Sequence, residues 1–407
     1  EIKQPFVGVV TTWNEAAPSN ITLARQAQAV KRGVAAAGGT PREFTTITVT
    51  DGIAMGHAGM KSSLVSREII ADSVELTMRG HCYDALVGLA GCDKSLPGMM
   101  MVMVRLNVPA VFMYGGSILP GRFENKDVTI VDVFEGVGRH IGGTMNDADL
   151  LTLEKAACPS GGSCGGQFTA NTMACVSEAI GLALPGSAGA PAVYESRDQY
   201  GERSGAAVLN LLEKNIRPRD IVTLESIKNA ATVVAATGGS TNAALHLPAI
   251  ANECGIDFDL HDVAEVFKRT PLIANLKPNG DYVAKDLFEV GGVQVIIKEL
   301  LDGGYLNGDC LTVTGNTLAE NVANLPALAQ DQEIIRPLSN PIKATGHIQI
   351  LRGNLAPDGA VAKITGKEGS VFKGTANVFD SEEAMVAALE AKQIKPGDVV
   401  IIRFEGP

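Results

Sequence analysis

The chain has 407 residues, of which 45% are hydrophobic and 19% charged, and its formal net charge is -11. This length and apolar content favour large buried cores and two domains rather than one. The acidic balance argues against nucleic-acid binding, which needs clustered Lys and Arg. No apolar run reaches the roughly 18 residues that span a bilayer. A soluble metabolic protein without membrane contact is the default expectation.

Seven cysteines, an odd number, favour a reducing compartment over a disulfide framework. We therefore expect a cytoplasmic protein, or one in an organelle matrix if a transit peptide has been removed. The chain begins with Glu1 rather than Met, so we also expect a leading segment before it.

Strand and helix patterns alternate over residues 1–330, which predicts an α/β domain with mainly parallel sheets flanked by helices. Apolar runs predict strands, and amphipathic periodicity predicts helices. In chain order the pattern predicts a strand over 6–12, a helix over 22–38, a strand over 44–50, a loop over 51–60, a helix over 67–80, and strands over 84–91 and 108–116.

Residues 331–407 predict a smaller, mainly β and barrel-like C-terminal domain that is incomplete at Pro407. A stretch rich in Pro and turn residues comes first. Short strands are then predicted over 347–354, 360–366, 370–379 and 398–404, with one helix over 381–392 that Asp380 or Ser381 caps.

Cys92, Asp93 and Lys94 interrupt an apolar region, between the runs ALVGLA and GMMMVMV. Burial of a charge costs several kcal/mol unless the charge is paired or bound to a metal. This stretch therefore needs a partner.

Cys164 lies in the glycine-rich stretch CPSGGSCGGQF, just before a helix predicted to begin near Gln167. The stretch lacks the GKS or GKT ending of a P-loop, so phosphate binding is the weaker interpretation. Glycines allow close backbone approach, and a helix N-terminus favours a thiolate. A metal ligand and an ordinary turn with a free thiol remain equally open.

Asp51 follows a predicted strand, and ligands bind at the carboxyl ends of strands in open α/β sheets. A lone Asp in a DG turn is more often only a turn residue. Ser240 and Thr241, in GGSTNAALHL, lie at a predicted helix start. Helix capping is their expected role, and binding of a substrate carboxylate is the alternative.

Taken together, a series of ordered segments resembles the dihydroxyacid dehydratases of the IlvD/Edd dehydratase family, over essentially the whole chain from Pro5 to Pro407. The segments are DGIAMGHAGM, SREIIADS, GCDKSLPGM, GGSILPGRF with DVTIVDVFE, CGGQFTANTMA, LPGSAGAPA, GGSTNAALHL and CLTVTGNTLAEN.

The resemblance implies an iron-sulfur cluster, often 2Fe-2S, beside a magnesium ion. Cys92 and Cys164 match cluster ligands, and Asp51 and Asp93 match magnesium ligands. Thiolate suits iron, and carboxylate suits magnesium. Lys94 matches a lysine that is carbamylated in relatives; the alternative is an ammonium paired with Asp93.

The implied chemistry is loss of water from a 2,3-dihydroxy carboxylate to give a 2-oxo acid, in valine and isoleucine biosynthesis. The proton-abstracting base of the family is a serine expected beyond Pro407, so no catalytic base is assigned here. The family also implies a homodimer. A sugar-acid dehydratase acting on aldonates or 6-phosphogluconate is the alternative enzyme.

Ser19 departs from the family pattern, because relatives with a 2Fe-2S cluster have PCN where this chain has PSN. A hydroxyl is a weaker iron ligand than a thiolate. The change is either engineered or natural, and it keeps open a third interpretation: a cluster-deficient, inactive paralogue.

Overall fold

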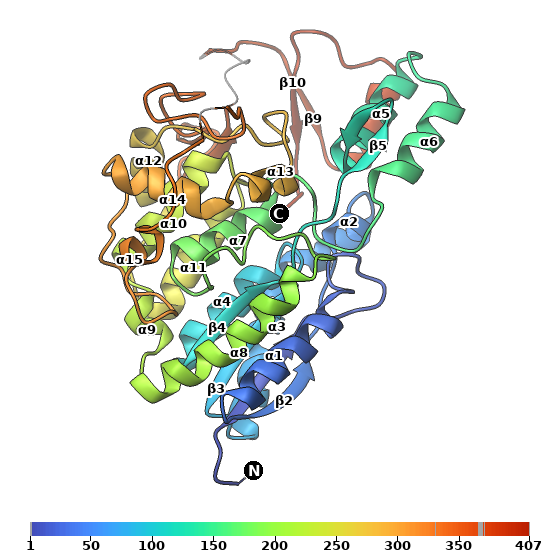
Figure 1. Ribbon diagram of the computed structural model, residues 1–407. Coiled ribbons are helices and arrows are strands. Elements are labelled where there is room, and N and C mark those ends of the chain that lie inside the picture. Colours follow the sequence, from blue (N-terminus) through green and yellow to red (C-terminus); the bar gives the residue numbers. More distant parts are fainter. Residues whose placement is uncertain (1, 330, 365–368, 370, 407) are drawn as a thin grey trace.

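The computed structural model describes residues 2–329, 331–364, 369 and 371–406. A four-stranded, all-parallel sheet forms its lower half (Figure 1), with strand order β2-β1-β3-β4. Its strands are β1 (Phe6–Thr11), β2 (Thr40–Thr45), β3 (Ala85–Ala90) and β4 (Ala110–Tyr114). Every residue of β3 and β4 is buried, as expected of continuous apolar runs in a parallel sheet.

Helices flank this sheet and confirm the α/β prediction. Helix α1 (Leu23–Ala36) packs on α8 (Ser196–Lys214), and α3 (Ser63–Gly80) packs on α4 (Ser95–Leu106). The α1–α8 contact requires glycine: a Cβ added to Gly33 would lie 2.0 Å from the Glu202 carbonyl oxygen. Backbone-to-backbone approach of this kind explains the glycines within both helices.

The order of the strands places a topological switch point between β1 and β3. From β1 the chain crosses through α1 to β2 on one side, and from β3 it crosses through α4 to β4 on the other. Right-handed crossovers in opposite directions place the two helices on opposite faces of the sheet. Ligands of such sheets bind at the carboxyl ends of the strands on either side of this point.

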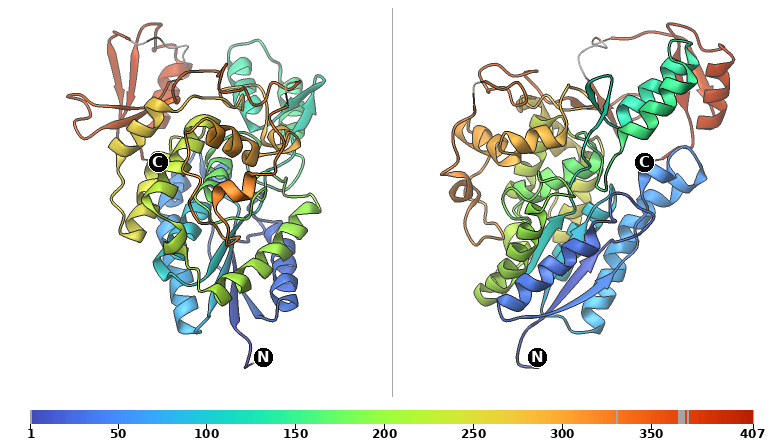
Figure 2. Two further views of the ribbon diagram at one scale, coloured as in Figure 1. Left: turned by 60° about the vertical axis from the view of Figure 1, so that its left-hand side comes forward. Right: turned by 45° about the vertical axis from the view of Figure 1, so that its right-hand side comes forward.

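A second, helical layer packs against α4 (Figure 2), chiefly through α7 and α11. Its helices and the remaining short elements of this part are α2 (Asp51–Ala54), η1 (Ala58–Ser62), α7 (Thr169–Ala179), α9 (Pro218–Ile221), α10 (Leu224–Thr237), α11 (Ala243–Cys254), α12 (Leu260–Arg269), α13 (Ala284–Glu289), α14 (Val293–Asp302) and α15 (Leu318–Val322). Helical structure thus replaces the strand and helix alternation that was expected to continue to residue 330.

A small projection carries the hairpin β5 (Gly121–Phe123) and β6 (Lys126–Val128) with helices α5 (Ile130–Ile141) and α6 (Asp147–Ala157). It has its own apolar cluster around Val128 and Leu153. In Figures 1 and 2 it lies at the end of the molecule opposite the N-terminus, as do β9 and β10.

The C-terminal part is β-rich, as predicted. It contains an antiparallel hairpin of β7 (Ile348–Leu351) with β8 (Ala360–Lys363), and a parallel pair of β9 (Ala376–Phe379) with β10 (Val399–Ile402) around α16 (Glu382–Glu390). Ser381 caps α16 by accepting the N–H of Ala384. The barrel-like closure and the domain division at residue 330 stay predictions. Position 330, and parts of the strands predicted over 360–366 and 370–379, lie outside the described residues.

Two local predictions were wrong. Strand β2 spans Thr40–Thr45, not 44–50, because the extended backbone of residues 40–45 pairs with β1 and the chain leaves the sheet after Thr45. The segment predicted as a loop over 51–60 contains the short helix α2 and the beginning of η1. Propensity favoured the β-branched run TTITVT, but pairing with β1 decided the register.

Candidate metal and cluster site

Three loops meet at the carboxyl ends of β1 and β3. The loop after β1 contacts the glycine-rich loop, because Gly162 N–H donates to the Pro18 carbonyl at 2.9 Å. It also touches the turn after β3, since a Cβ added to Gly91 would lie 2.1 Å from the Ser19 carbonyl oxygen. The Ser163 hydroxyl donates to the Gly91 carbonyl. These contacts bring together the backbones that carry Ser19, Cys92 and Cys164.

Cys92 is held in a tight turn at the start of α4. Its N–H donates to the Ser95 hydroxyl at 3.0 Å, and that hydroxyl donates back to the Cys92 carbonyl at 2.9 Å. Burial raises the pKa of the Cys92 thiol, and the charge of Asp93 raises it further. The sulfur lies 3.5 Å from the Thr50 hydroxyl, next to Asp51.

Cys164 has the same electrostatic character. Its side chain is exposed to solvent, unlike that of Cys92, but the protein packed around the sulfur raises the pKa of its thiol, with further contributions from Asp93, Cys92 and Cys158. Neither thiol therefore ionises readily without a nearby cation. Iron supplies such a charge, and thiolate ligands lose their proton when a metal binds. This donor chemistry fits a cluster, with Ser19 on the adjoining loop.

Asp51, Asp93 and Lys94 form one buried cluster. Lys94 is 1% exposed. Its Nζ lies 2.9 Å from Asp51 Oδ2 and 3.4 Å from Asp93 Oδ2. The second oxygen of Asp51, Oδ1, accepts the Ser63 hydroxyl at 2.6 Å. The structure thus brings together the side chains of the predicted magnesium site, with the ammonium between two carboxylates.

The charges of this cluster do not balance. Burial raises the pKa of Asp93 to about 7, opposed by Lys94 and reinforced by Asp51. Burial alone would lower the pKa of Lys94, but Asp93 and Asp51 outweigh it and raise the pKa. One cation faces two acids, so the cluster has an excess of negative charge when both acids are ionised. Such a place attracts a further cation.

A magnesium ion fits this donor set only in part. In the part of the chain that the structure describes, no group of three His, Cys, Asp or Glu side chains could hold a metal. Asp51 and Asp93 supply two carboxylates, and Mg²⁺ commonly takes one or two carboxylates and keeps several waters. An ammonium has no lone pair to donate. Lys94 fits as a ligand only if its nitrogen carries an oxygen donor.

Residues from two other helices hold Asp93, and the sequence analysis missed them. Asn242 Nδ2 donates to Thr169 Oγ1 at 3.0 Å and makes a long contact of 3.5 Å with Asp93 Oδ2. Thr169 also hydrogen-bonds Asp93 and thereby favours its ionised form. Both residues lie within segments that resemble the family, GGSTNAALHL and CGGQFTANTMA. Asn and Thr are also common at helix starts, however, so the residue type alone did not indicate a role at the site.

Ser240 belongs to the same network. Its hydroxyl lies 2.9 Å from Thr169 Oγ1 and accepts the N–H of Asn242 at 3.2 Å. Thr241 contributes its carbonyl oxygen, which accepts the N–H of Ala244 at 3.0 Å in the first turn of α11. The geometry thus places Ser240 near Asp93 and gives Thr241 a backbone contact in the helix start.

A neutral histidine lies behind Lys94. His246 is fully buried, and its Nδ1 lies 3.1 Å from Arg67 Nη1. Burial lowers the pKa of His246 well below its ordinary value, and Arg67 and Lys94 lower it further. His246 therefore adds no positive charge to the cluster.

None of the helices that the structure describes is both long and apolar enough to cross a bilayer. Among known families, the dihydroxy-acid/6-phosphogluconate dehydratase N-terminal model matches residues 4–321, and the corresponding C-terminal model matches 333–407.

Similar proteins agree with this match. The chain is 69% identical to the dihydroxy-acid dehydratase of Parvibaculum lavamentivorans, over 100% of this chain and 71% of that protein. Identity is 66% to that of Pelagibacter ubique and 53% to that of a Nocardioides species, over 100% of this chain and 71% and 72% of those proteins. The chain therefore belongs to the dihydroxy-acid/6-phosphogluconate dehydratase family.

Proposed function

We propose that the protein is a hydro-lyase that converts 2,3-dihydroxy-3-methyl carboxylic acids to 2-oxo acids in branched-chain amino-acid biosynthesis. The observation that carries the proposal is the cluster of Asp51, Asp93 and Lys94 beside Cys92 at the switch point of the sheet. The names of the similar proteins favour this substrate class over aldonates and 6-phosphogluconate. A homodimer in the cytoplasm or an organelle matrix is part of the proposal.

In this proposal Asp51 and Asp93 hold Mg²⁺, and Cys92 and Cys164 hold the iron-sulfur cluster, with Ser19 at the third position. When bound, these groups supply Lewis acidity that acidifies the C2 proton and stabilises the departing C3 hydroxide. The reaction breaks the C2–H and C3–O bonds, releases water and leaves an enol that tautomerises to the 2-oxo acid. No electron transfer is needed.

The residues of this chain position and protect the site. Thr169 and Asn242 both contact Asp93 and orient it, and the hydrogen bond from Thr169 favours its charged form. Metal-ligating carboxylates depend on such second contacts for their orientation. Burial of Cys92 and Lys94 keeps bulk water away. Low local polarity strengthens electrostatic interactions with a bound substrate.

Lys94 has two roles in this proposal. As an ammonium it partly neutralises Asp51 and Asp93 when no divalent cation is bound. With Mg²⁺ present, the ammonium would be repelled; after loss of a proton its amine would add to CO₂, and loss of a second proton would leave a carbamate that supplies a negative oxygen donor. Metal binding and the release of these two protons would thus be coupled.

The substrate assignment is tested by comparing kcat/KM for 2,3-dihydroxy-3-methylbutanoate, gluconate and 6-phosphogluconate. We expect the branched substrate to be preferred. Asp93→Asn should weaken Mg²⁺ binding by at least about 100-fold, which exceeds the typical loss when a residue that only hydrogen-bonds a metal ligand is replaced. The matched control is Asp302→Asn, a carboxylate 63% exposed in an ion pair on α14. Preference for a sugar acid, or unchanged Mg²⁺ affinity in Asp93→Asn, would contradict the proposal.

Ser19 is tested separately. A cluster held by two thiolates and one hydroxyl loses iron readily, so we expect partial iron occupancy in the protein as isolated. Ser19→Cys, followed by anaerobic reconstitution, should raise bound iron and visible absorption together. Full iron content before the substitution, with no response to it, would show that Ser19 is not the vacant ligand position. Unchanged low iron in Ser19→Cys would instead favour the inactive paralogue.

A further inference from the structure

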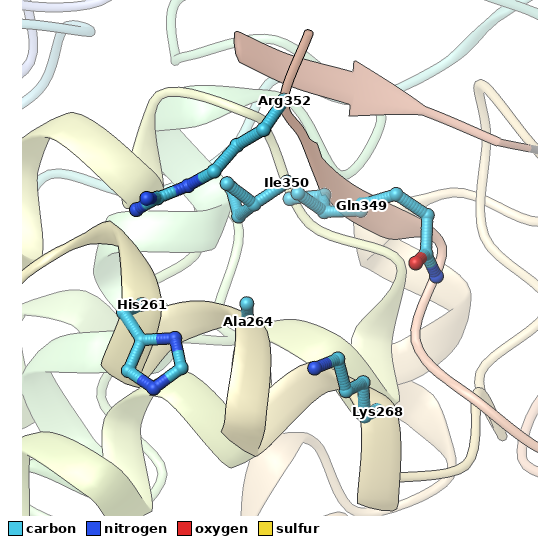
Figure 3. Close-up of a pocket in the computed structure, with 7 residues that line it drawn as sticks. His261, Ala264, Lys268, Gln349, Ile350 and Arg352 are labelled. Carbon is cyan, nitrogen blue, oxygen red and sulfur yellow. The ribbon is translucent and has the colours of Figure 1, made fainter. Parts of the chain in front are cut away.

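A cavity of about 250 Å³ lies between α12 and β7 (Figure 3), and none of its lining residues belongs to the candidate metal site. Ala264 from the helix and Ile348 and Ile350 from the strand give it an apolar floor. The helix lies within the segment that matches the N-terminal family model, and the strand lies within the C-terminal match. Ligand pockets occur preferentially at such junctions.

Basic side chains surround the apolar floor. Arg352 and His261 lie on one side and Lys268 lies on the other (Figure 3). Lys268 pairs with Glu265 at 2.7 Å, but both side chains are more than half exposed, which makes this pair weak. The chain as a whole has a net charge of -11, so this group of basic side chains is a local exception. Its positive potential favours binding of an anion here.

We propose that this cavity binds a small aliphatic carboxylate, with the carboxylate paired with Arg352, the alkyl group on Ile350 and Ala264, and Lys268 adding positive charge from the opposite side. Arg suits this role because its planar donors match a carboxylate in two parallel hydrogen bonds. The cavity lies below the roughly 300–1,000 Å³ of sites for drug-sized ligands, so a nucleotide is too large. The apolar floor distinguishes an alkyl carboxylate from inorganic phosphate, which gains nothing there.

A bound carboxylate bridges two parts of the fold. His347, directly before β7, contacts the Gly239 carbonyl through Nε2 at 2.6 Å, and α12 packs on α10. A ligand that touches both α12 and β7 therefore stabilises their contact in the folded protein only. Binding should raise the melting temperature in a concentration-dependent way.

The test is calorimetric titration of the whole protein with 3-methylbutanoate, with the melting temperature as a second measurement. We expect saturable binding that Arg352→Gln and Lys268→Gln each weaken by about fivefold, the scale of one exposed charge pair. Lys228→Gln is the matched control, because Lys228 also pairs with a Glu three residues earlier. It should leave binding unchanged. The neutral 3-methylbutanamide and inorganic phosphate should bind more weakly than the carboxylate.

Asp51→Asn separates this site from the proposed dehydratase site. Binding that survives in Asp51→Asn but weakens in Arg352→Gln supports the new site, whether or not the protein dehydrates dihydroxy acids. Binding lost in Asp51→Asn and unchanged in Arg352→Gln would assign the probe to the metal site and overturn the inference. Equal affinity for phosphate, or no saturable binding of 3-methylbutanoate, would overturn it as well.

Discussion

Two fully buried cations lie near the carboxyl ends of the sheet strands, and their surroundings differ. Lys94, after β3, contacts the carboxylates of Asp51 and Asp93. Arg197, in the first turn of α8, donates to the backbone carbonyls of Ala190 and Tyr114, each at 2.7 Å, and lies 5.4 Å from the centre of the Tyr114 ring. Burial lowers the pKa of Arg197 to about 10, whereas the two carboxylates raise that of Lys94.

The comparison distinguishes two roles. Arg197 is a structural cation that holds parts of the fold together, whereas Lys94 occupies a place that a metal ion can take. Backbone carbonyls of Ala190 and Tyr114 are fixed by the fold, so Arg197 ties β4 to the start of α8. Side-chain carboxylates remain available as oxygen ligands when an ammonium leaves, and a divalent cation can take its place. The partners of a buried charge, rather than burial itself, thus indicate which site can bind a metal.

The largest expected effect is on folding. Arg197→Met leaves two buried carbonyls without donors, and each lost partner costs about 1–3 kcal/mol. With the lost contact to the Tyr114 ring, we expect the free energy of unfolding to fall by about 3–5 kcal/mol. Urea unfolding measures the loss. Added Mg²⁺ should not change it, and a Mg²⁺-dependent loss would break the comparison.

Lys94→Met should destabilise the protein by about 3 kcal/mol in buffer free of CO₂ and divalent ions, because it leaves two buried carboxylates unpaired. The loss stays at the lower end of the roughly 3–5 kcal/mol that breaking a buried ion pair costs. The reason is that Asp93, with a pKa of about 7, readily takes a proton. Mg²⁺ should shrink the loss, because the two carboxylates are then free to bind it. Unfolding curves with and without Mg²⁺ decide this, and an unchanged deficit would argue against a metal at Lys94.

The pH dependence of stability tests the region around Arg197, because the buried carboxylate of Glu178 interacts with the Arg197 charge. This carboxylate accepts the N–H groups of Gly186 and Ala188 at 2.8 and 2.6 Å. Burial nevertheless raises its pKa from 4.5 to about 7. Between these values the unfolded chain has lost a proton that the folded protein keeps. Stability therefore falls as pH rises from 4.5 to 7 and levels off above that, by up to about 3 kcal/mol from this group.

Glu178→Gln removes this titration and loses one acceptor at every pH. The difference in unfolding free energy between the parent protein and the variant should therefore change across pH 4.5 to 7 and be flat above it. Parallel pH curves for the two proteins would show that Glu178 is ionised throughout.

The smallest effect is expected at Asn242. Asn242→Ala removes the contacts to Thr169 and Asp93. It should weaken Mg²⁺ binding by about 10–100-fold, the usual loss when a residue that contacts a metal ligand is replaced. Calorimetry measures the affinity, and the melting temperature should change little. Asn321→Ala is the control, because Asn321 makes similar side-chain contacts to Thr312 and Thr314. Equal effects of both variants on Mg²⁺ affinity would remove Asn242 from the site.

The sequence by itself determined the strands β1, β3 and β4, the helix after β1, and the CDK stretch as a place that needs a partner. These features are local: continuous apolar runs, helical periodicity and charges inside an apolar region are visible within a short window. The family segments similarly pointed to Asp51 and Cys164 before any spatial information was present.

Only the tertiary structure decided which distant residues support Asp93. Asn242 lies 149 positions from Asp93 and contacts it because α11 packs on α4. Likewise, pairing with β1 set the bounds of β2, and the close approach of Gly91 to Ser19 brought the loops of the site together. Such contacts depend on how elements pack, and one sequence carries no signal for the distance between segments that are far apart in the chain.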